Sequence, residues 1–476
     1  MSRFALPLGS LVAWSAVALV VLVVGWSLPI DDFWLALASG RAIVDGADLA
    51  RPLPFSWTAE VPGAINPQWG AQLLLGGHGS LPIALALNAT LLAVGLGLTV
   101  LRAASRAPIL SVLVALLATL AALAPHLLAR PQSFSIALFP LALLLLERFP
   151  RRAWLPIAYG VLMVVWANLH GAFVIGQLAA GVWLVAAVLR RQSLAIPMAT
   201  AAVAALAPLL NPAGPALLAY AYGQPATAVV TAISVEWQPS WPWVPVATPF
   251  WIILAALVAG RWIRRFGAPL PDLILAALLG ALAISAIRHI PWFLLAAMPM
   301  LAADVGRALA RAGRLRRALG TVPSALSGQR ARMTLTLVGV LILVFQLARP
   351  MLADAVGRLV PDEPSRVVDR LATEVSSGDR ILNEQVWGGY LAHRLWPELQ
   401  TAMDGRLEIR SRDEWATYFG LMQGRDEPAA QLEARGIGWV LVGEGRDALR
   451  NALTAAGWEM VADDGYATLF RAPTGG

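Results

Sequence analysis

The chain of 476 residues contains no cysteine, and only 14% of its residues are charged. The lack of cysteine excludes disulfides, thiolate metal sites and thiol catalysis. A soluble domain carries about 25% charged residues. The low charge, the 58% hydrophobic residues and the mean hydropathy of +0.66 therefore exclude an ordinary soluble protein. This composition predicts an integral membrane protein.

Apolar segments long enough to cross a hydrocarbon core of about 30 Å recur from Leu11 to Leu347. We interpret the first, Leu11 to Leu28, as a retained span, because its apolar core exceeds the usual 7–15 residues of a signal peptide. The expected fold is an all-α polytopic membrane domain with about eleven transmembrane helices over residues 1–352. The predicted spans are 11–28, 81–101, 108–127, 134–147, 153–169, 173–189, 194–210, 249–263, 272–287, 291–306 and 334–348.

The basic residues are all arginine, and they predict an orientation. Basic residues accumulate on the cytoplasmic side of membrane proteins, and a cytoplasmic N-terminus puts most of them in inner loops. Residues 1–350 hold 23 arginines and 9 acidic residues, which gives this region a net charge of +14. Residues 351–476 hold 13 arginines and 20 acidic residues, which gives a net charge of −7. Inner loops on anionic lipid account for the basic excess, and nucleic acid is not an expected partner. We expect a plasma (bacterial inner) membrane protein with an extracytoplasmic C-terminal tail.

That tail, residues 353–476, is predicted to be a soluble α/β domain. Its firmest element is a hairpin, 459–462 and 466–471, around the turn Asp463-Asp464-Gly465. The other expected helices are 365–376, 390–396, 412–423, 428–435 and 447–456, and the other strands are 380–383, 399–403 and 439–442.

Two adjacent acids, Asp31 and Asp32, follow the first span and begin an outer loop over residues 29–80. Carboxylates at a membrane face are costly unless they are solvated, paired or used. The apolar spacing over 33–44 predicts an amphipathic helix lying at the membrane interface, ended by Gly46. A second short helix is expected from about Trp69 to Leu75.

These segments resemble a known family. Asp31-Asp32, the segment 40–46 (GRAIVDG) and the segment 67–73 (PQWGAQL) are similar to the first outer loop of GT-C glycosyltransferases, which include protein mannosyltransferases and aminoarabinose and lipopolysaccharide-core sugar transferases. The resemblance implies a polyprenyl-phosphate sugar donor at the outer face and an acidic catalytic base at the start of this loop. In the tail, Asn383-Glu384, the segment 387–391 (WGGYL) and the segment 403–406 (MDGR) are similar to a branch of GT-C-like bacterial membrane proteins.

The chemistry favours Asp31 or Asp32 as general base. Glycosyl transfer needs a base for the acceptor hydroxyl and a positive partner for the departing phosphate, and adjacent carboxylates raise each other's proton affinity. The other aspartate would orient the acceptor or hold a divalent cation; no metal or cofactor is firmly implied. The alternative is structural: Asp31 caps the following helix and Asp32 is solvated in its first turn.

Further candidates lie in predicted outer loops or at outer span ends. Arginine grips phosphate oxygens and histidine adds a hydrogen bond, whereas Trp69 could stack on a sugar. Each also has an ordinary alternative, because arginines snorkel to headgroups and tryptophans form interfacial belts. The candidate substrate-binding residues are Trp69, Arg130, Asn168, His170, Arg288 and His289.

The sequence thus predicts a membrane glycosyltransferase that inverts the anomeric centre while moving a hexosyl or pentosyl group from a polyprenyl-phosphate donor. The acceptor would be extracytoplasmic, and membrane lipids are the other expected partners. Two alternatives stay open: a transporter or flippase for a lipid-linked glycan, and a non-catalytic membrane scaffold in which the aspartates are dispensable.

Overall fold

The computed structural model describes residues 29–223, 231–232, 234–241, 244, 246–263, 265–311 and 363–473. The predicted spans 11–28 and 334–348 lie outside them. The chain divides into two compact units. The helical unit comprises Met1–Ser27, Leu85–Gly214 and Thr231–Ala355, and the loop–tail unit comprises Leu28–Ala84, Pro215–Val230 and Val356–Gly476.

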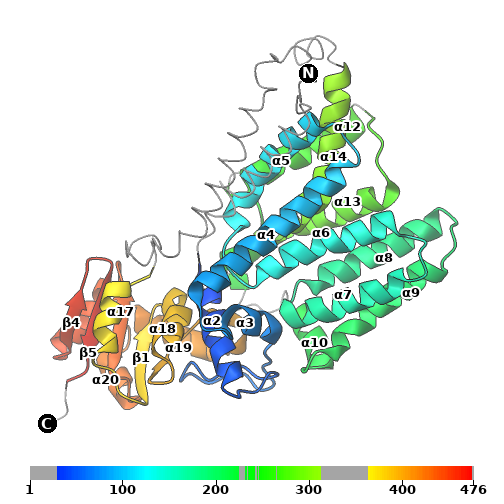
Figure 1. Cartoon of the computed structure of the whole chain (residues 1–476). Coiled ribbons are helices and arrows are strands. Elements are labelled where there is room, and N and C mark those ends of the chain that lie inside the picture. Colours follow the sequence, from blue (N-terminus) through cyan, green and yellow to red (C-terminus); the bar gives the residue numbers. More distant parts are fainter. Residues whose placement is uncertain are drawn as a thin grey trace, which may run out of the picture. The chain divides into compact units, whose positions relative to one another are not determined.

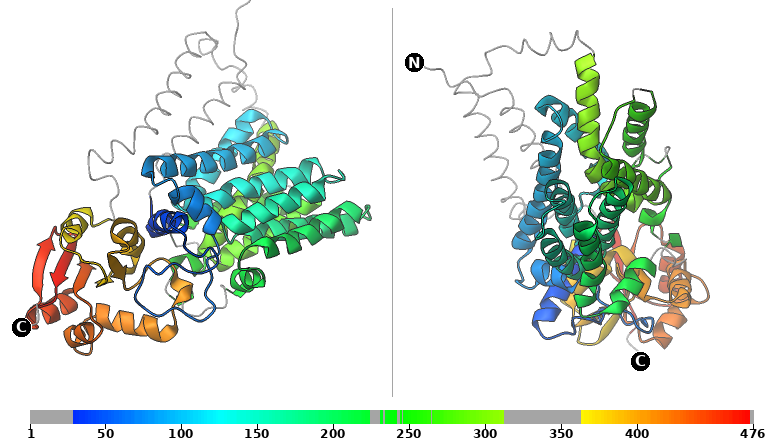
Figure 2. Two further views of the ribbon diagram at one scale, coloured as in Figure 1. Left: turned by 60° about the horizontal axis from the view of Figure 1, so that its bottom comes forward. Right: turned by 90° about the vertical axis from the view of Figure 1, so that its right-hand side faces the viewer.

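The helical unit is built from apolar helices, of which α6, α7, α8 and α9 run side by side (Figures 1 and 2). Small residues permit close packing: a methyl group on Gly95 in α4 would lie 2.2 Å from the Ile136 carbonyl oxygen of α6. The helices are α4 (Leu81–Ala104), α5 (Ile109–Leu123), α6 (Gln132–Arg148), α7 (Leu155–Leu169), α8 (Phe173–Leu189), α9 (Ala195–Leu206), α12 (Thr248–Trp262), α13 (Leu270–Ser285) and α14 (Ile290–Arg311), with short 3-10 turns η1 (Ala124–His126), η2 (Ala207–Leu210), η4 (Val235–Trp237) and η5 (Ile287–His289).

Three helices in the described part of the chain are long and apolar enough to cross a membrane: Leu81–Ala104, Ile109–His126 and Ile287–Arg311. A fourth is possible if Ala195–Leu210 and Pro215–Gly223, bent by 105°, form one broken span. Four other apolar helices, α7, α8, α12 and α13, are shorter, at 10–17 residues. The helical membrane fold is therefore confirmed, whereas the number of eleven spans stays a prediction.

Polar contacts join the helix ends that the sequence predicts on the inner side. Arg102, only 1% exposed, pairs with Glu147 at 2.5 Å and donates to the Leu295 carbonyl oxygen at 2.9 Å. Arg106 also pairs with Glu147, at 3.0 Å, and with Asp272. The ends of α4 and α6 and the start of α13 therefore meet. The side of the membrane on which they lie stays a prediction.

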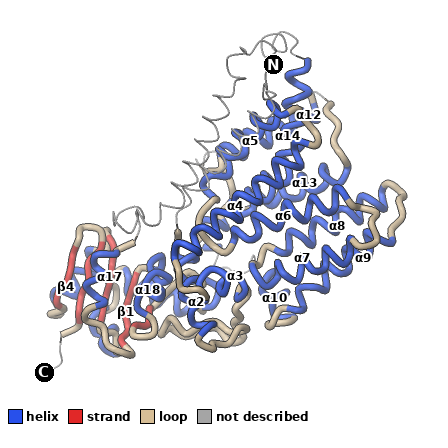
Figure 3. Tube along the Cα trace, in the orientation of Figure 1, coloured by secondary structure: helices blue, strands red, loops and turns tan. Residues whose placement is uncertain are grey.

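The loop–tail unit contains the sheet of the described structure (Figure 3). The strand order is β2-β1-β3-β5-β4; β1 pairs in parallel with β2 and β3, whereas β5 is antiparallel to β3 and β4. Every residue of the central strand β3 is buried. The strands are β1 (Asp379–Asn383), β2 (Leu399–Thr401), β3 (Trp439–Gly443), β4 (Glu459–Asp463) and β5 (Ala467–Arg471).

The helices of this unit agree with the sequence pattern to within a few residues. Ser411 caps α19 by accepting a hydrogen bond from the Glu414 backbone N–H, within an S-x-x-E sequence of the kind found at helix starts. The helices and turns are α2 (Asp31–Val44), α3 (Trp69–Gly76), α10 (Pro215–Gly223), α17 (Ser365–Ala372), α18 (Gly388–Leu395), α19 (Arg412–Met422), α20 (Pro428–Ala434), α21 (Asp447–Ala455), η7 (Gln385–Trp387) and η8 (Leu407–Ile409).

The first loop, 29–80, shares this compact unit with the tail. Its segment around Phe55 lies along the edge strand β2: Thr401 N–H donates to the Phe55 carbonyl oxygen, and Trp57 N–H donates to the Thr401 carbonyl oxygen. The Thr58 hydroxyl donates to the Ala402 carbonyl oxygen at 2.7 Å. Backbone pairing therefore fixes the loop to the sheet.

Candidate functional site

Asp31 and Asp32 form the first turn of α2, and the N-cap position is Ile30. Asp31 is therefore not the helix cap, and the structure does not support the capping alternative for this residue. First-turn carboxylates are favoured by the partial positive charge of a helix N-terminus.

Helix α2 is where the sequence predicts it, but its surroundings differ from the prediction. Its side chains from Phe33 to Ala38 are all buried, and the helix packs against α3 and α18. A methyl group on Gly40 would lie 2.2 Å from the Gln72 carbonyl oxygen, so α2 and α3 touch backbone to backbone. The apolar face of α2 thus packs against α3 and the tail helix α18 rather than being open to lipid, whereas the position of α2 at the membrane interface stays a prediction.

Two glycine-containing segments of the tail meet the aspartates. Gly389, in the first turn of α18, donates its backbone N–H to Asp31 Oδ1 at 2.5 Å. A methyl group on Gly405 would lie 2.6 Å from Asp31 Oδ2 and 2.7 Å from Asp32 Oδ1. Asp31 Oδ2 is buried and has no hydrogen-bond partner among the described residues. One oxygen of Asp31 is therefore held, and the other is an unused proton acceptor.

The electrostatic surroundings of Asp31 favour its protonated form. Burial, followed by the charges of Asp404 and Asp32, raises the pKa of Asp31 well above its ordinary value, and the Gly389 hydrogen bond only partly opposes this. When it is ionised, a carboxylate with a raised pKa takes up a proton more strongly than a solvated aspartate does, and this suits a general base.

Asp404 has the opposite character. Although burial opposes its ionisation, Arg406 contacts both carboxylate oxygens and lowers the pKa of Asp404. The Ser56 hydroxyl, from the first loop, donates to Asp404 Oδ2 at 2.7 Å. Asp404 therefore stays ionised, fixes the turn that contains Gly405, and supplies part of the negative potential at Asp31. The sequence motif 403–406 drew attention to this residue, but only the structure gives it a role.

A second polar cluster lies within the helical unit. Arg130, whose side chain is 7% exposed, pairs with Glu236 of η4 at 2.5 Å. Arg288 lies over the Trp237 ring, 4.1 Å from its centroid, and the same ring contacts His289 edge-on at 6.0 Å. Burial disfavours ionisation of Glu236, but the charges of Arg130 and Arg288 outweigh it and lower the pKa of Glu236. Three candidates, Arg130, Arg288 and His289, are therefore brought together.

His170 and Asn168 lie at the end of α7, close to this cluster. His170 Nδ1 lies 2.8 Å from the Ser135 hydroxyl and accepts a hydrogen bond from Ala172 N–H at 3.2 Å. Burial, together with the charges of Arg288 and Arg130, lowers the pKa of His170 to about 3, so its imidazole is neutral. Asn168 accepts a hydrogen bond from the Asn211 side-chain amide at 3.2 Å. These contacts give both residues a structural role beside the predicted one.

The candidates thus form two groups, one in each compact unit. Asp31, Asp32 and Trp69, the first residue of α3, belong to the loop–tail unit. The other candidates belong to the helical unit. Glu236 was missed by the sequence analysis; its only signal is that it is a lone acid beside Trp237 in an aromatic loop.

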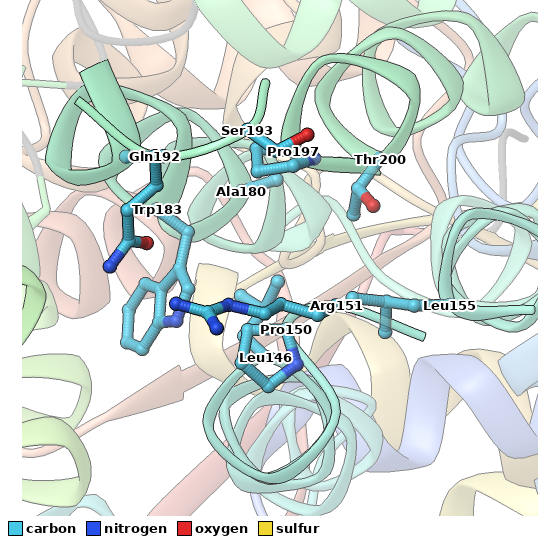
Figure 4. Close-up of a pocket in the computed structure, with 11 residues that line it drawn as sticks. Leu146, Pro150, Arg151, Leu155, Ala180, Trp183, Gln192, Ser193, Pro197 and Thr200 are labelled. Carbon is cyan, nitrogen blue, oxygen red and sulfur yellow. The ribbon is translucent and has the colours of Figure 1, made fainter. Parts of the chain in front are cut away.

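Two further features do not involve the candidate residues. In the described part of the chain, no group of three or more His, Asp or Glu side chains is arranged to hold a metal ion. A cavity between the ends of α6, α7, α8 and α9 is lined by Arg151, Trp183, Gln192, Ser193 and Thr200, with apolar neighbours (Figure 4). None of the candidate residues lines this cavity.

Comparison with known proteins gives the fold. The sequence matches no protein-family model and no curated protein. Among solved structures, ArnT from Cupriavidus metallidurans in the apo state matches with a TM-score of 0.57 and 16% identity over 98% of each chain. The same protein bound to undecaprenyl phosphate gives 0.55 and 15%, again over 98% of each chain. The apo oligosaccharyltransferase of Archaeoglobus fulgidus gives 0.54 and 12%, over 97% of this chain and 74% of the other.

The chain has the GT-C fold. The resemblance predicted from the first loop is therefore confirmed, and the likeness to ArnT extends over almost the whole chain. Because the match covers 98% of this chain, it includes the C-terminal tail as well as the helical unit.

Proposed function

We propose that this protein is a membrane glycosyltransferase that moves a sugar from a polyprenyl-phosphate donor to an extracytoplasmic acceptor hydroxyl. The observation that carries the proposal is the state of Asp31: one oxygen is oriented by Gly389 N–H, the other is unused, and its pKa is raised. The GT-C fold supports the reaction class, and the undecaprenyl phosphate bound to ArnT supports the choice of donor lipid.

In the proposed reaction, Asp31 Oδ2 accepts the proton of the acceptor hydroxyl as the hydroxyl oxygen attacks the anomeric carbon. The new C–O bond forms as the bond from the anomeric carbon to the phosphate oxygen breaks, so polyprenyl phosphate leaves with the bonding electrons. Attack from the face opposite the leaving group inverts the anomeric centre. Burial, then the charges of Asp404 and Asp32, raise the pKa of Asp31 and so its proton affinity.

The leaving phosphate needs positive partners. We assign this task to Arg130 and Arg288, with His289 beside them, because these side chains gather in one cluster of the helical unit. His170 is neutral and therefore serves as a hydrogen-bonding group rather than as a charge. Trp69 and Asn168 remain proposed sugar or acceptor contacts.

The proposed setting is the bacterial inner membrane, with a cytoplasmic N-terminus and the loop–tail unit outside. The arginine distribution supports this orientation. The donor would then be reached from the lipid, and the acceptor would arrive from the extracytoplasmic space.

The test is the release of polyprenyl phosphate from a polyprenyl-phosphate sugar by the purified full chain with Asp31→Asn or Asp32→Asn. Loss of the base should reduce kcat by about 10²–10⁴ in Asp31→Asn, with a smaller loss in Asp32→Asn. Asp413→Asn is the matched control, because Asp413 also lies in the first turn of a helix but is exposed. If lipid-linked sugar crosses vesicle membranes without cleavage, the protein is a flippase. If the wild type neither cleaves nor moves the lipid-linked sugar, the scaffold alternative holds. If the wild type releases polyprenyl phosphate and neither variant lowers the rate, the assignment of the base is wrong.

A further inference from the structure

The short turn η4 contacts both arginines that we assign to the leaving phosphate. Glu236 pairs with Arg130 at 2.5 Å, and the neighbouring Trp237 ring lies 4.1 Å from the Arg288 guanidinium carbon. The turn is held to η5 by a hydrogen bond from Ile287 N–H to the Gln238 carbonyl oxygen, at 3.0 Å. One three-residue element thus covers two separate cationic groups.

The two partners of the ion pair differ in their access to water. The Arg130 side chain is 7% exposed, whereas that of Glu236 is 39% exposed. Although its ionised end is partly buried against Arg130, the Glu236 side chain reaches water, whereas that of Arg130 does not. A buried arginine that loses its partner is strongly destabilising, so the carboxylate can leave only if another anion takes its place.

Arg130 and three residues near it in the chain or in the cluster carry buried polar atoms without a hydrogen-bond partner among the described residues. Arg130 Nε, His289 Nδ1, His126 Nε2 and Gln132 Oε1 are all buried and make no hydrogen bond within the described structure. A carboxylate offers two acceptor oxygens, and one of them already contacts Arg130. A phosphate group offers more oxygens in a tetrahedral arrangement, and it could also accept hydrogen bonds from groups such as Arg130 Nε that the carboxylate leaves unpaired.

We propose that Glu236 occupies the phosphate position of the donor site, and that polyprenyl phosphate binds by displacing the Glu236 carboxylate from Arg130. This inference rests on the proposed function, because it takes Arg130 as a phosphate ligand. Glu236 is then a residue that sets donor affinity. The exchange replaces one anion by another beside Arg130, so the buried guanidinium is never left without a partner.

If Glu236 and the donor phosphate compete for Arg130, the affinity for the donor depends on the fraction of time that Arg130 is not paired with Glu236. When a competing state occupies the site for 90–99% of the time, the apparent Kd is about ten to a hundred times the intrinsic value. Glu236→Gln keeps the shape of the side chain but removes its charge. It should therefore tighten the binding of polyprenyl phosphate by about ten- to a hundredfold.

The experiment measures the Kd of polyprenyl phosphate for the full chain in lipid nanodiscs, in wild type, Glu236→Gln, Arg130→Gln and the double variant. We expect tighter binding in Glu236→Gln, weaker binding in Arg130→Gln, and no gain from Glu236→Gln once Arg130 is replaced. Glu236→Asp, which keeps the charge, should stay near wild type and gives a second readout if Glu236→Gln does not fold. Glu459→Gln removes an exposed ion pair in the tail and should leave Kd unchanged.

The outcomes separate the two proposals. If Arg130→Gln weakens binding but Glu236→Gln weakens it too or leaves it unchanged, the displacement model is wrong and the phosphate site stands. If Arg130→Gln leaves binding unchanged, the phosphate assignment in the proposed function fails, and the displacement model fails with it.

Discussion

A single methyl group at Gly405 should disable the candidate base while leaving the fold largely intact. In Gly405→Ala, the added carbon would lie 2.6 Å from Asp31 Oδ2 and 2.7 Å from Asp32 Oδ1. Ordinary contact begins near 3.4 Å, so the two oxygens must retreat by about 0.8 and 0.7 Å. Both are ends of side chains, which can rotate away without moving the backbone.

We expect Gly405→Ala to lower the reaction rate more than it lowers the stability of the fold. A misplacement of about 1 Å can reduce a rate by about a hundredfold, and crowding of this kind costs about 1–3 kcal/mol of stability. We therefore expect kcat for the release of polyprenyl phosphate to fall by about a hundredfold, with a modest decrease in the thermal unfolding midpoint.

Two other glycines of the tail serve as comparisons. A methyl group on Gly420, within α19, would meet no atom within 4 Å, so Gly420→Ala should keep full activity and gain up to about 1 kcal/mol of stability. In Gly389→Ala the methyl would lie 2.4 Å from the Asp31 carbonyl oxygen and 2.9 Å from the Leu35 nitrogen, which are backbone atoms, so stability and activity should fall together. Full activity in Gly405→Ala would refute the placement of the reaction at these carboxylates.

Three further predictions follow from the charges around Asp31. Because the pKa of Asp31 is raised, the acid limb of the pH profile of kcat/KM should lie above the ordinary aspartate value of about 3.9, and Asp32→Asn should shift it to lower pH; an unchanged limb would contradict the coupling of the two residues. A raised folded pKa means that ionised Asp31 costs stability above about pH 3.9. Asp31→Asn should therefore raise the unfolding midpoint at pH 7 by the equivalent of about 1–3 kcal/mol, although it lowers kcat by about 10²–10⁴. Asp404 has a lowered pKa, so its contribution to folding stability is present above about pH 3.9 and is lost as the pH falls through the folded pKa. Asp404→Asn should cost about 3–5 kcal/mol of stability at pH 7, because it leaves the largely buried Arg406 without its carboxylate partner. A small loss would show that Arg406 finds another partner.

Much of the local structure could be predicted because it depends on nearby residues. Apolar periodicity located the helices of both units, and the turn Asp463-Asp464-Gly465 located the hairpin, in which Gly465 has a φ of +82°. The alternation of arginine-rich and arginine-poor loops predicted the two sides of the membrane, and this orientation stays a prediction; the ion pairs of Glu147 with Arg102 and of Asp272 with Arg106 show only that these helix ends lie together. These signals need no knowledge of the rest of the chain.

The meeting of distant segments could not be predicted in the same way. The bond between Gly389 N–H and Asp31 joins residues 358 positions apart, and no local pattern encodes it. The apolar side of α2 looks like a lipid-facing surface until the tail helix α18 is placed against it. Glu236 carries no motif, and its importance comes from the charge of Arg130, 106 positions away.

The tail is best understood as part of the machinery that sets the proton affinity of Asp31. Asp404 and Asp31 both lie near the turn that contains Gly405, but their pKa values are shifted in opposite directions. Arg406 lowers the pKa of Asp404, whereas burial raises the pKa of Asp31. The permanent charge of Asp404 raises the pKa of Asp31, and Gly389 N–H fixes which oxygen is free. Without the tail, Asp31 would be a solvated first-turn aspartate whose pKa lies near 3.9. It would then be a weaker base, so the proposed role of Asp31 depends on the tail.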